Sequence, residues 1–413
     1  MSLRMITAPP TPEVLAETLA EATAQRRAVT PWGAGRHQHL GLPPSDDAFP
    51  LSTVGLARIL EYAPADLTMT LEAGARLADV QALLSANGQW LPWDPPGGRA
   101  ATIGGLLAAG RSGPLRLGYG TPRDWLLGAH VALGDGRLVK SGGKVVKNVA
   151  GYDAHKLHLG ALGTLGVLIS VTLKLAPLPE RSATLAFTSP SHDVLFEAAE
   201  LLRRPPLAPT SLAIVGAPAA KRLLTSVPNQ QSMILARYVG VERAVERQLR
   251  EARANLAGIS SQSDLVLYDI EAGDRTSLAV VWERISEYAM PVGTELVLRI
   301  GVRPPALGSA LTLLSQQLPP ETELLGYPGV GLAYARWFPD AADHGTLAHT
   351  LAELRRVLAP HEGYLVVEAA PPALRTTLDL WGPPPLTLPI MQRLKAQWDP
   401  AGILNPGRYL PGL

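Results

Sequence analysis

The chain has 413 residues, of which 46% are hydrophobic and 18% are charged, and its formal net charge is +1. Because that charge is close to zero, no global field would attract nucleic acid or an acidic membrane surface. The absence of cysteine excludes disulfides, thiolate zinc sites, iron–sulfur clusters and cysteine nucleophiles from this chain. The length predicts two or three domains, with enough apolar residues to bury their cores.

The N-terminal segment 1–27 lacks an apolar core of signal-peptide length. The longest uncharged stretch, 157–173, contains His158 and several glycines, so it does not read as a membrane span. We therefore expect a soluble cytoplasmic protein without a transmembrane segment.

The first glycine loop follows a predicted helix at 13–27 and an extended stretch at 28–31. The loop itself, 32–37, resembles the start of a dinucleotide fingerprint, but its third glycine is missing and the proline-containing segment 38–44 cannot open a helix. This excludes a Rossmann site. A short loop of small residues beside Arg36 remains, which suits a pyrophosphate through backbone N–H groups and charge-assisted bonds.

A strand at 67–72, a helix at 77–84 and a strand at 89–93 lead into the region 94–169, where glycine is dense and charge is sparse. Such a region can be a set of tight turns, or it can let a ligand approach the backbone closely. A hairpin is predicted around Gly134 to Gly136, and a strand at 166–175 closes the domain.

Beyond Glu180, helices and strands alternate without glycine clusters, which predicts a mixed or antiparallel sheet with helices on one face, as two ferredoxin-like halves. The predicted strands are 183–188, 212–215, 233–238, 265–268, 295–302, 332–337 and 364–369. The predicted helices are 194–202, 241–256, 307–318, 346–358 and, near the C-terminus, 388–397.

Five ordered segments together resemble the FAD-binding domain of the vanillyl-alcohol oxidase type, also called PCMH-type. They are the glycine loop 31–41, the block 94–113, residues 118–124, the turn 163–167 and the C-terminal segment 399–408. The resemblance implies an α+β fold. A PCMH-type FAD-binding domain of two α+β subdomains (1–180) would be followed by a mixed or antiparallel-sheet cap domain (181–380) and a C-terminal segment that returns to the FAD domain (381–413).

Within that family, Lys147 to Asp153, Asp94 to Pro96 and Arg336–Trp337 resemble the E subunits of bacterial glycolate oxidase, or glycolate dehydrogenase. The resemblance implies an FAD-dependent oxidoreductase subunit that acts on the CH–OH group of glycolate, a 2-hydroxy acid, to give glyoxylate. It also implies an FAD-binding D subunit and an iron–sulfur F subunit as partners, which agrees with the lack of cysteine here. Peripheral membrane association through such a complex would follow.

The resemblance also implies the residues that contact FAD. Segments 33–37 and 102–105 would bind the pyrophosphate. Segment 163–167, with Ile169, would lie along the isoalloxazine and adenine. An ordinary turn before a strand is the alternative interpretation of 163–167. Because the glycine pair beside the histidine of covalent relatives is missing around His37 and His39, we expect non-covalent FAD. The full set is Pro31, Trp32, Gly33, Ala34, Gly35, Arg36, His37, Pro95, Thr102, Ile103, Gly104, Gly105, Ala109, Gly110, Gly113, Tyr119, Gly120, Arg123, Asp124, Gly163, Thr164, Gly166, Val167, Ile169 and Asn405.

Oxidation of a 2-hydroxy acid requires hydride transfer to flavin, a base for the hydroxyl proton and a cation for the carboxylate. Arg299 and Arg336, on predicted strands, are candidate carboxylate binders, although arginines on strands are commonly solvated. Tyr152, with Lys147 and His155, is a candidate near the flavin, with a structural role as the alternative.

We expect no metal, because the histidine motif of related D-2-hydroxy-acid dehydrogenases is absent and the segment 361–363 has the reverse order. This leaves three functions open. They are an oxidising subunit, a non-catalytic FAD-bearing interaction subunit, and a stand-alone flavin alcohol oxidase.

Overall fold

The structure is a computed structural model that describes residues 7–144, 151–223, 231–259, 279–339, 344–410 and 413. It divides into two compact units. The first contains the described residues up to Ser112 together with Thr121–Leu178 and Pro383–Leu413, and the second contains Gly113–Gly120 and Pro179–Gly382.

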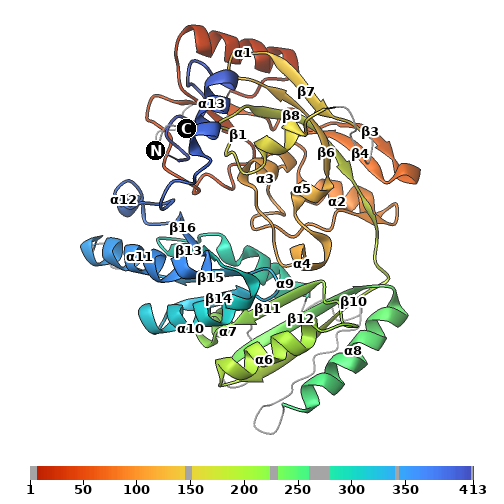
Figure 1. Cartoon of the computed structure of the whole chain (residues 1–413). Helices are drawn as coiled ribbons and strands as arrows, with labels where there is room; N and C mark the ends of the chain where they lie inside the picture. The colour runs from red at the N-terminus through yellow and green to blue at the C-terminus, as the bar shows by residue number, and fades with distance from the viewer. Residues whose placement is uncertain (1–6, 145–150, 224–230, 260–278, 340–343, 411–412) are drawn as a thin grey trace. The chain divides into compact units, whose positions relative to one another are not determined.

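The first unit is built on a five-stranded antiparallel sheet in the order β3-β4-β8-β6-β7. Two short pairs accompany it, β1 with β2 in parallel and β5 with β9 in antiparallel. Figure 1 labels the strands of the five-stranded sheet, β3, β4, β6, β7 and β8. The strands predicted at 67–72 and 166–175 and the hairpin predicted at 125–139 are confirmed. The elements are α1 (Pro12–Ala24), β1 (Val29–Trp32), β2 (Phe49–Ser52), β3 (Ile59–Ala63), β4 (Thr68–Glu72), α2 (Leu77–Ser85), β5 (Gln89–Trp90), α3 (Ile103–Ala109), α5 (Pro122–Trp125), β6 (Leu126–Ala132), β7 (Leu138–Gly142), β8 (Val167–Lys174), β9 (Ala176–Pro177) and α13 (Leu388–Trp398).

The two ends of the chain meet in the core of the first unit. Helix α1 starts at the N-cap Thr11, whose hydroxyl accepts a hydrogen bond from a helix N–H, and buries a face that includes Leu15 and Leu19. That face belongs to one apolar cluster with Ile169 of β8 and with Ile403. The N–H of Val29 donates to the Ile403 carbonyl at 2.8 Å. Closing this core therefore requires the C-terminal segment.

The second unit contains a seven-stranded sheet in the order β10-β12-β11-β14-β15-β13-β16, with antiparallel pairing throughout. Its second half runs β13-α10-β14-β15-α11-β16, and the strand order β16-β13-β15-β14 is that of a ferredoxin-like unit. The first half follows the same order from β10 to α8, and the strand predicted next, 265–268, lies outside the described residues. Strand β14 was not predicted from the sequence. The elements are α4 (Arg116–Tyr119), β10 (Arg181–Ser189), α6 (His192–Arg203), β11 (Ser211–Val215), α7 (Ala217–Leu223), β12 (Ser232–Gly240), α8 (Glu242–Ala257), α9 (Ala279–Ser286), β13 (Leu296–Gly301), α10 (Leu307–Gln317), β14 (Glu323–Tyr327), β15 (Leu332–Trp337), α11 (His344–Leu358), β16 (Tyr364–Ala369) and α12 (Pro372–Arg375).

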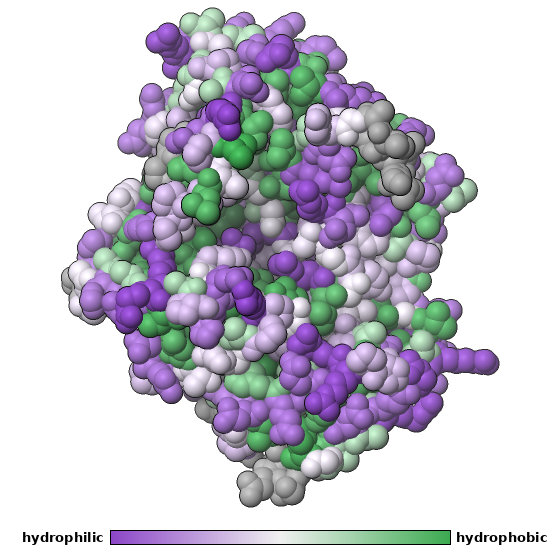
Figure 2. Space-filling view, viewed as in Figure 1, coloured by the Kyte–Doolittle hydropathy of each residue, from purple (hydrophilic) through white to green (hydrophobic). Residues whose placement is uncertain are grey.

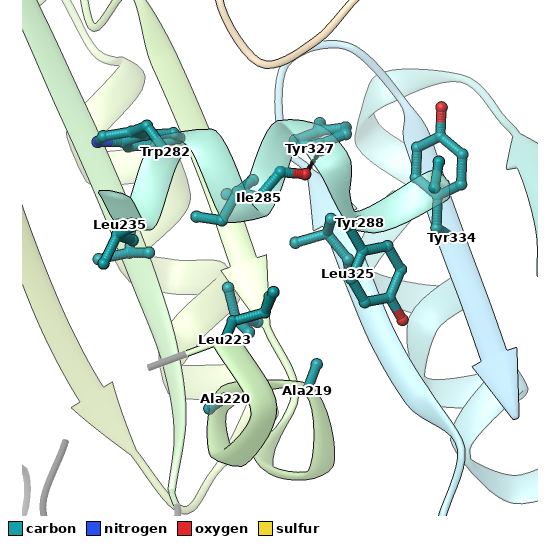
Figure 3. Packing of buried hydrophobic residues seen from close by; sticks show 14 of the residues in the cluster. Ala219, Ala220, Leu223, Leu235, Trp282, Ile285, Tyr288, Leu325, Tyr327 and Tyr334 are labelled. Atoms are coloured by element: carbon teal, nitrogen blue, oxygen red, sulfur yellow. Dashed lines mark hydrogen bonds between the residues drawn. The ribbon is translucent and has the colours of Figure 1, made fainter. Parts of the chain in front are cut away.

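Helices cover both faces of this sheet, so the expectation of helices on one face is wrong. One cluster joins Leu185 of β10 to α6 and α8, whereas its neighbour in the strand, Ala186, belongs to a cluster with α7 and α9. Figure 3 shows the second cluster, in which Ile285 of α9 and Leu223 of α7 pack over the strands. The physical reason is that successive side chains of a strand point to opposite faces. All five residues of β11 are buried, so both faces need a cover.

Residues 113–120 belong to the second unit, although the sequence placed them in the first domain. The N–H of Gly118, in α4, donates to the carbonyl of Thr210 at 3.1 Å. A Cβ at Gly118 would lie 2.8 Å from the Cα of Thr210. This close backbone approach, which only glycine permits, ties the segment to the start of β11.

No helix among the described residues is both long enough and apolar enough to span a bilayer. On the face of the molecule shown in Figure 2, hydrophilic and hydrophobic residues are intermixed.

Candidate functional site

An open cavity of about 690 Å³ lies in the first unit. Its walls are the loop after β1, the start of α3, the turn before β8, and the C-terminal residues Asn405 and Arg408. These are four of the segments that the glycine pattern singled out, and the fold brings them together around one space.

The loop after β1 presents a row of backbone donors to this cavity. The N–H groups of residues 33–37 donate no hydrogen bond to any other described residue. The loop is held at its ends instead, where the N–H of Thr53 donates to the Trp32 carbonyl at 2.8 Å and that of Leu40 to the His37 carbonyl at 3.2 Å. Successive N–H groups in a turn that donate to no protein acceptor form an anion-binding concavity.

The start of α3 packs directly against this loop. Thr102 is the N-cap of the helix and accepts a hydrogen bond from the Gly105 N–H at 3.2 Å. A Cβ at Gly33 would lie 2.2 Å from the Thr102 hydroxyl oxygen, and one at Gly104 would lie 2.8 Å from the Cβ of Ala73. The small residues in these motifs are therefore required by the close packing of the cavity wall itself.

The turn before β8 is fixed by Asn405, whose side-chain amide donates to the Leu162 carbonyl at 2.6 Å. Gly163 has a φ of +72°, and a Cβ there would lie 3.1 Å from the Pro31 side chain. The other amide atom, Oδ1 of Asn405, is buried and has no hydrogen-bond partner within the described part of the chain. A buried acceptor without a protein partner beside a cavity is the kind of atom that a bound molecule satisfies.

Lys395 of α13 connects the turn to the C-terminal segment. Its ammonium donates to the carbonyls of Thr164 and Leu404, each at 2.8 Å, and to the carboxylate of Asp399 at 2.6 Å. Asp399 also accepts the Leu404 N–H at 2.8 Å. Burial lowers the pKa of Lys395, and the Asp399 carboxylate opposes that shift. One buried ion pair therefore positions two walls of the cavity.

Two basic residues flank the loop. His37 donates its Nε2 hydrogen to the Pro96 carbonyl at 3.0 Å, and burial, helped by the nearby charge of Arg111, lowers the pKa of His37 to about 4. Its imidazole is therefore neutral at physiological pH. Arg408, a buried cation that lines the cavity, donates to the Gln38 carbonyl at 3.0 Å. The loop thus carries a fixed positive charge beside its N–H groups.

The structure brings fifteen of the predicted cofactor residues to the cavity wall. They are Pro31, Trp32, Gly33, Ala34, Gly35, Arg36, His37, Thr102, Gly104, Gly105, Ala109, Gly163, Gly166, Val167 and Asn405.

The other ten do not line the cavity. Pro95, Ile103, Gly110, Arg123, Asp124, Thr164 and Ile169 lie elsewhere in the first unit, and Gly113, Tyr119 and Gly120 belong to the second. Asp124 instead caps α5, where its carboxylate accepts the Thr121 N–H at 2.7 Å.

Sequence reasoning missed seven lining residues, most of which flank the chosen motifs. Arg408 was part of a recognised segment but received no role, and Thr53 follows β2, where no motif signalled it. The seven are Gln38, Thr53, Ala101, Ala108, Leu162, Leu168 and Arg408.

The two predicted arginines are held by carboxylates in the second unit. Arg336 is buried, forms a short ion pair with Glu295 and donates to the Tyr288 carbonyl at 3.0 Å. These contacts make it a core residue, which does not support its expected role as a carboxylate binder. Arg299 is partly exposed and pairs with the buried Glu368 at 2.9 Å.

Tyr152 is 95% exposed and does not line the cavity. Lys147 lies outside the described residues. His155 is buried, and its Nδ1 lies 3.1 Å from the hydroxyl of Ser141, which gives this histidine a structural partner. Within the described ranges, no group of three His, Cys, Asp or Glu side chains is arranged to hold a metal ion.

Comparison with known proteins identifies the cofactor. The family model described as an FAD binding domain matches residues 4–142. The chain carries an FAD-binding domain. FAD as the expected cofactor is thereby confirmed.

The relatives of this flavoprotein are oxidoreductases. It is 28% identical to glycolate oxidase subunit GlcE of Escherichia coli over 404 residues, which cover 96% of each chain. It is 26% identical to the D-2-hydroxyglutarate dehydrogenase of Xanthomonas citri pv. viticola, over 94% of this chain and 85% of the relative. With glycolate oxidase subunit GlcD of Bacillus subtilis it shares 32% identity over 44% of this chain and 38% of the relative. The flavoprotein is an FAD-dependent oxidoreductase, and the predicted resemblance to glycolate oxidase E subunits is confirmed.

A solved structure confirms the fold class. The chain superposes on alkyldihydroxyacetonephosphate synthase with a TM-score of 0.72 and 15% sequence identity, over 97% of this chain and 75% of that chain. At this identity the likeness establishes the fold alone. The predicted α+β architecture, an FAD-binding domain with a cap domain, is correct.

Proposed function

We propose that the cavity of the first unit holds FAD, with its pyrophosphate on the N–H groups of residues 33–37. Two phosphate charges need several converging donors, and this loop has five that no other described residue uses. Arg408 supplies a fixed cation beside them. Asn405 supplies an acceptor for a polar group of the cofactor. When bound, FAD accepts a hydride from the carbon that bears the substrate hydroxyl.

We infer that the cofactor is held without a covalent bond to His37. The Nε2 hydrogen of this ring is engaged with the Pro96 carbonyl at 3.0 Å, which fixes the ring against the cavity wall. Acid precipitation tests the inference, because a non-covalent flavin stays in the supernatant. Yellow colour in the washed pellet would contradict it.

The substrate we propose is glycolate or a similarly small 2-hydroxy acid, oxidised to the 2-oxo acid within a complex. The observation that supports this substrate is the match to glycolate oxidase subunit GlcE, which covers nearly the whole length of both proteins. We propose an FAD-binding D subunit and an iron–sulfur F subunit as its partners. The chain has no cysteine, so a cluster that takes electrons from the flavin belongs to another protein.

A second function has support from the cap domain. Arg336 and Arg299, the predicted carboxylate binders, are both paired with glutamates of their own unit. If neither of these two arginines is available to the substrate, the chain would carry FAD as a non-catalytic subunit, while the related D subunit performs the oxidation. Both functions place FAD in the same cavity, so they differ only in whether glycolate reduces the flavin of this chain.

An anaerobic reduction experiment separates the two functions. The purified FAD-loaded chain is mixed with glycolate while the visible flavin absorption is followed, first alone and then with the D subunit. Bleaching of the isolated chain supports the oxidising subunit, and bleaching only after the D subunit is added supports the non-catalytic role. Hydrogen peroxide formation by the chain alone in air would instead indicate a stand-alone oxidase. Co-purification with D and F subunits, and with membranes only when these are present, tests the proposed complex and its peripheral location.

A further inference from the structure

A second cavity, of about 680 Å³, lies wholly within the second unit, where its two ferredoxin-like halves meet. Strands β11 and β14 join the halves through only two paired positions, Ile214 with Gly326 and Val215 with Leu325. Helix α6 of the first half and helix α10 of the second contribute walls to the space beside this junction. The cavity therefore lies where the two halves are joined by only the short β11–β14 pairing.

The walls of this cavity are largely apolar. Phe196 of α6, Leu311 of α10, Ile214 of β11 and Leu324 of β14 line it, together with three prolines. Such walls favour a ligand with an apolar body, because its transfer from water releases hydration at no cost in hydrogen bonds.

Two buried hydroxyl groups line the cavity, and one of them, that of Thr322, has a hydrogen to donate. Thr322 is only 5% exposed, and its hydroxyl has no hydrogen-bond partner in the part of the chain that the structure describes. The hydroxyl oxygen of Ser232 accepts the Ala217 N–H at 3.1 Å, and Nε2 of His192 lies 3.4 Å away from it. Buried hydroxyls are rarely left without a partner, and a bound ligand could supply the acceptor that no described residue gives Thr322.

We propose that this cavity is a binding site for a small molecule with an apolar chain and one carbonyl or carboxylate oxygen. The oxygen accepts a hydrogen bond from Thr322, with Ser232 and His192 beside it, and the chain lies against Phe196 and Leu311. No residue of this site lines the FAD cavity. Binding here is therefore a property separate from flavin chemistry, and its failure would leave the proposed function intact.

The test is isothermal titration of the FAD-loaded full chain with sodium octanoate and, separately, with octan-2-one. We expect saturable binding with one site per chain. Replacing Thr322 by Val keeps the shape but removes the donor, and it should weaken binding by about three- to tenfold, the effect of one hydrogen bond. The matched control is Thr350→Val on α11 of the same unit, whose hydroxyl bonds only within its helix, and it should bind like the wild type.

A blocking variant keeps the test decisive. Ser315 lines the cavity from α10 and is exposed, so Ser315→Trp should fold normally and fill the mouth, which thermal unfolding verifies. Its binding should fall below detection. Binding of octanoate alone supports a carboxylate ligand, and equal binding of octan-2-one supports a neutral carbonyl. No saturable binding of either probe, or unchanged binding in Ser315→Trp, overturns the proposal.

Discussion

The buried ammonium of Lys395 is the most informative group to perturb, because its contacts link α13, the turn before β8 and the C-terminal segment. Lys395→Met keeps the length of the side chain and removes its charge and its three hydrogen bonds. The substitution leaves the carboxylate of Asp399, whose side chain is fully buried, without its cation. It also releases the carbonyls of Thr164 and Leu404.

The expected loss has two parts. Removing one partner of a buried ion pair typically lowers the free energy of unfolding by about 3–5 kcal/mol, because an uncompensated charge remains. The two released carbonyls no longer fix the turn and the segment that carries Asn405, and each charge-assisted bond contributes about 1.5–3 kcal/mol. If FAD binding to Lys395→Met must restore the order that one of these hydrogen bonds gave, the dissociation constant of FAD rises by about ten- to a hundredfold relative to the wild type.

The assay measures both quantities in the same protein. Thermal unfolding gives the stability, and quenching of flavin fluorescence on titration into the apoprotein gives the FAD dissociation constant. The matched control is Lys174→Met, since Lys174 is on β8 but contacts the Trp125 ring instead of the turn. A folded Lys395→Met protein that binds FAD as tightly as the control would refute the positioning role, whatever its melting temperature.

Three further predictions follow from the described contacts. Gly33→Ala places a Cβ 2.2 Å from the Thr102 hydroxyl oxygen and should weaken FAD binding by about tenfold or more, whereas Gly143→Ala, with open space around its Cβ, should not. Because the pKa of His37 is lowered from 6.5 to about 4, the unfolded chain binds a proton in this window that the folded chain does not. The free energy of unfolding should therefore fall by roughly 3 kcal/mol as the pH drops from 6.5 to 4, and His37→Gln should flatten that dependence in denaturant titrations. Arg336→Met should lower the free energy of unfolding by about 3–5 kcal/mol without changing the FAD dissociation constant; a raised KM for glycolate at unchanged melting temperature would instead show that Arg336 binds substrate.

Local signals were sufficient for some elements of the first unit, although β2, β3 and α3 were not predicted. The alternation at 67–72 and the turn residues at 134–136 define β4 and the β6–β7 hairpin without reference to anything distant. The small residues of the loop 33–37 likewise marked a cavity wall, because glycine is needed wherever two backbones or a ligand approach closely.

Long-range contacts decided what the local patterns left open. The sequence gives no distance between Asn405 and Leu162, and only the fold places the amide of one on the carbonyl of the other. The segment 113–120 looked like part of a glycine-rich cofactor motif, yet the bond from Gly118 to Thr210 assigns it to the second unit. A glycine that admits a neighbouring strand and one that admits a ligand have the same sequence signal.

For this protein the sequence showed the order of the glycine-rich motifs, and the resemblance of those motifs to an FAD-binding family implied the cofactor class. Only the tertiary structure shows which charged side chains are paired within the protein and so are not available to a ligand. Arg336 was predicted from the sequence to bind a substrate carboxylate, but it is buried against Glu295, which lies 41 residues away along the chain. Since the cost of burying a charge depends on its neighbours in space, no local pattern could have revealed the partner of Arg336.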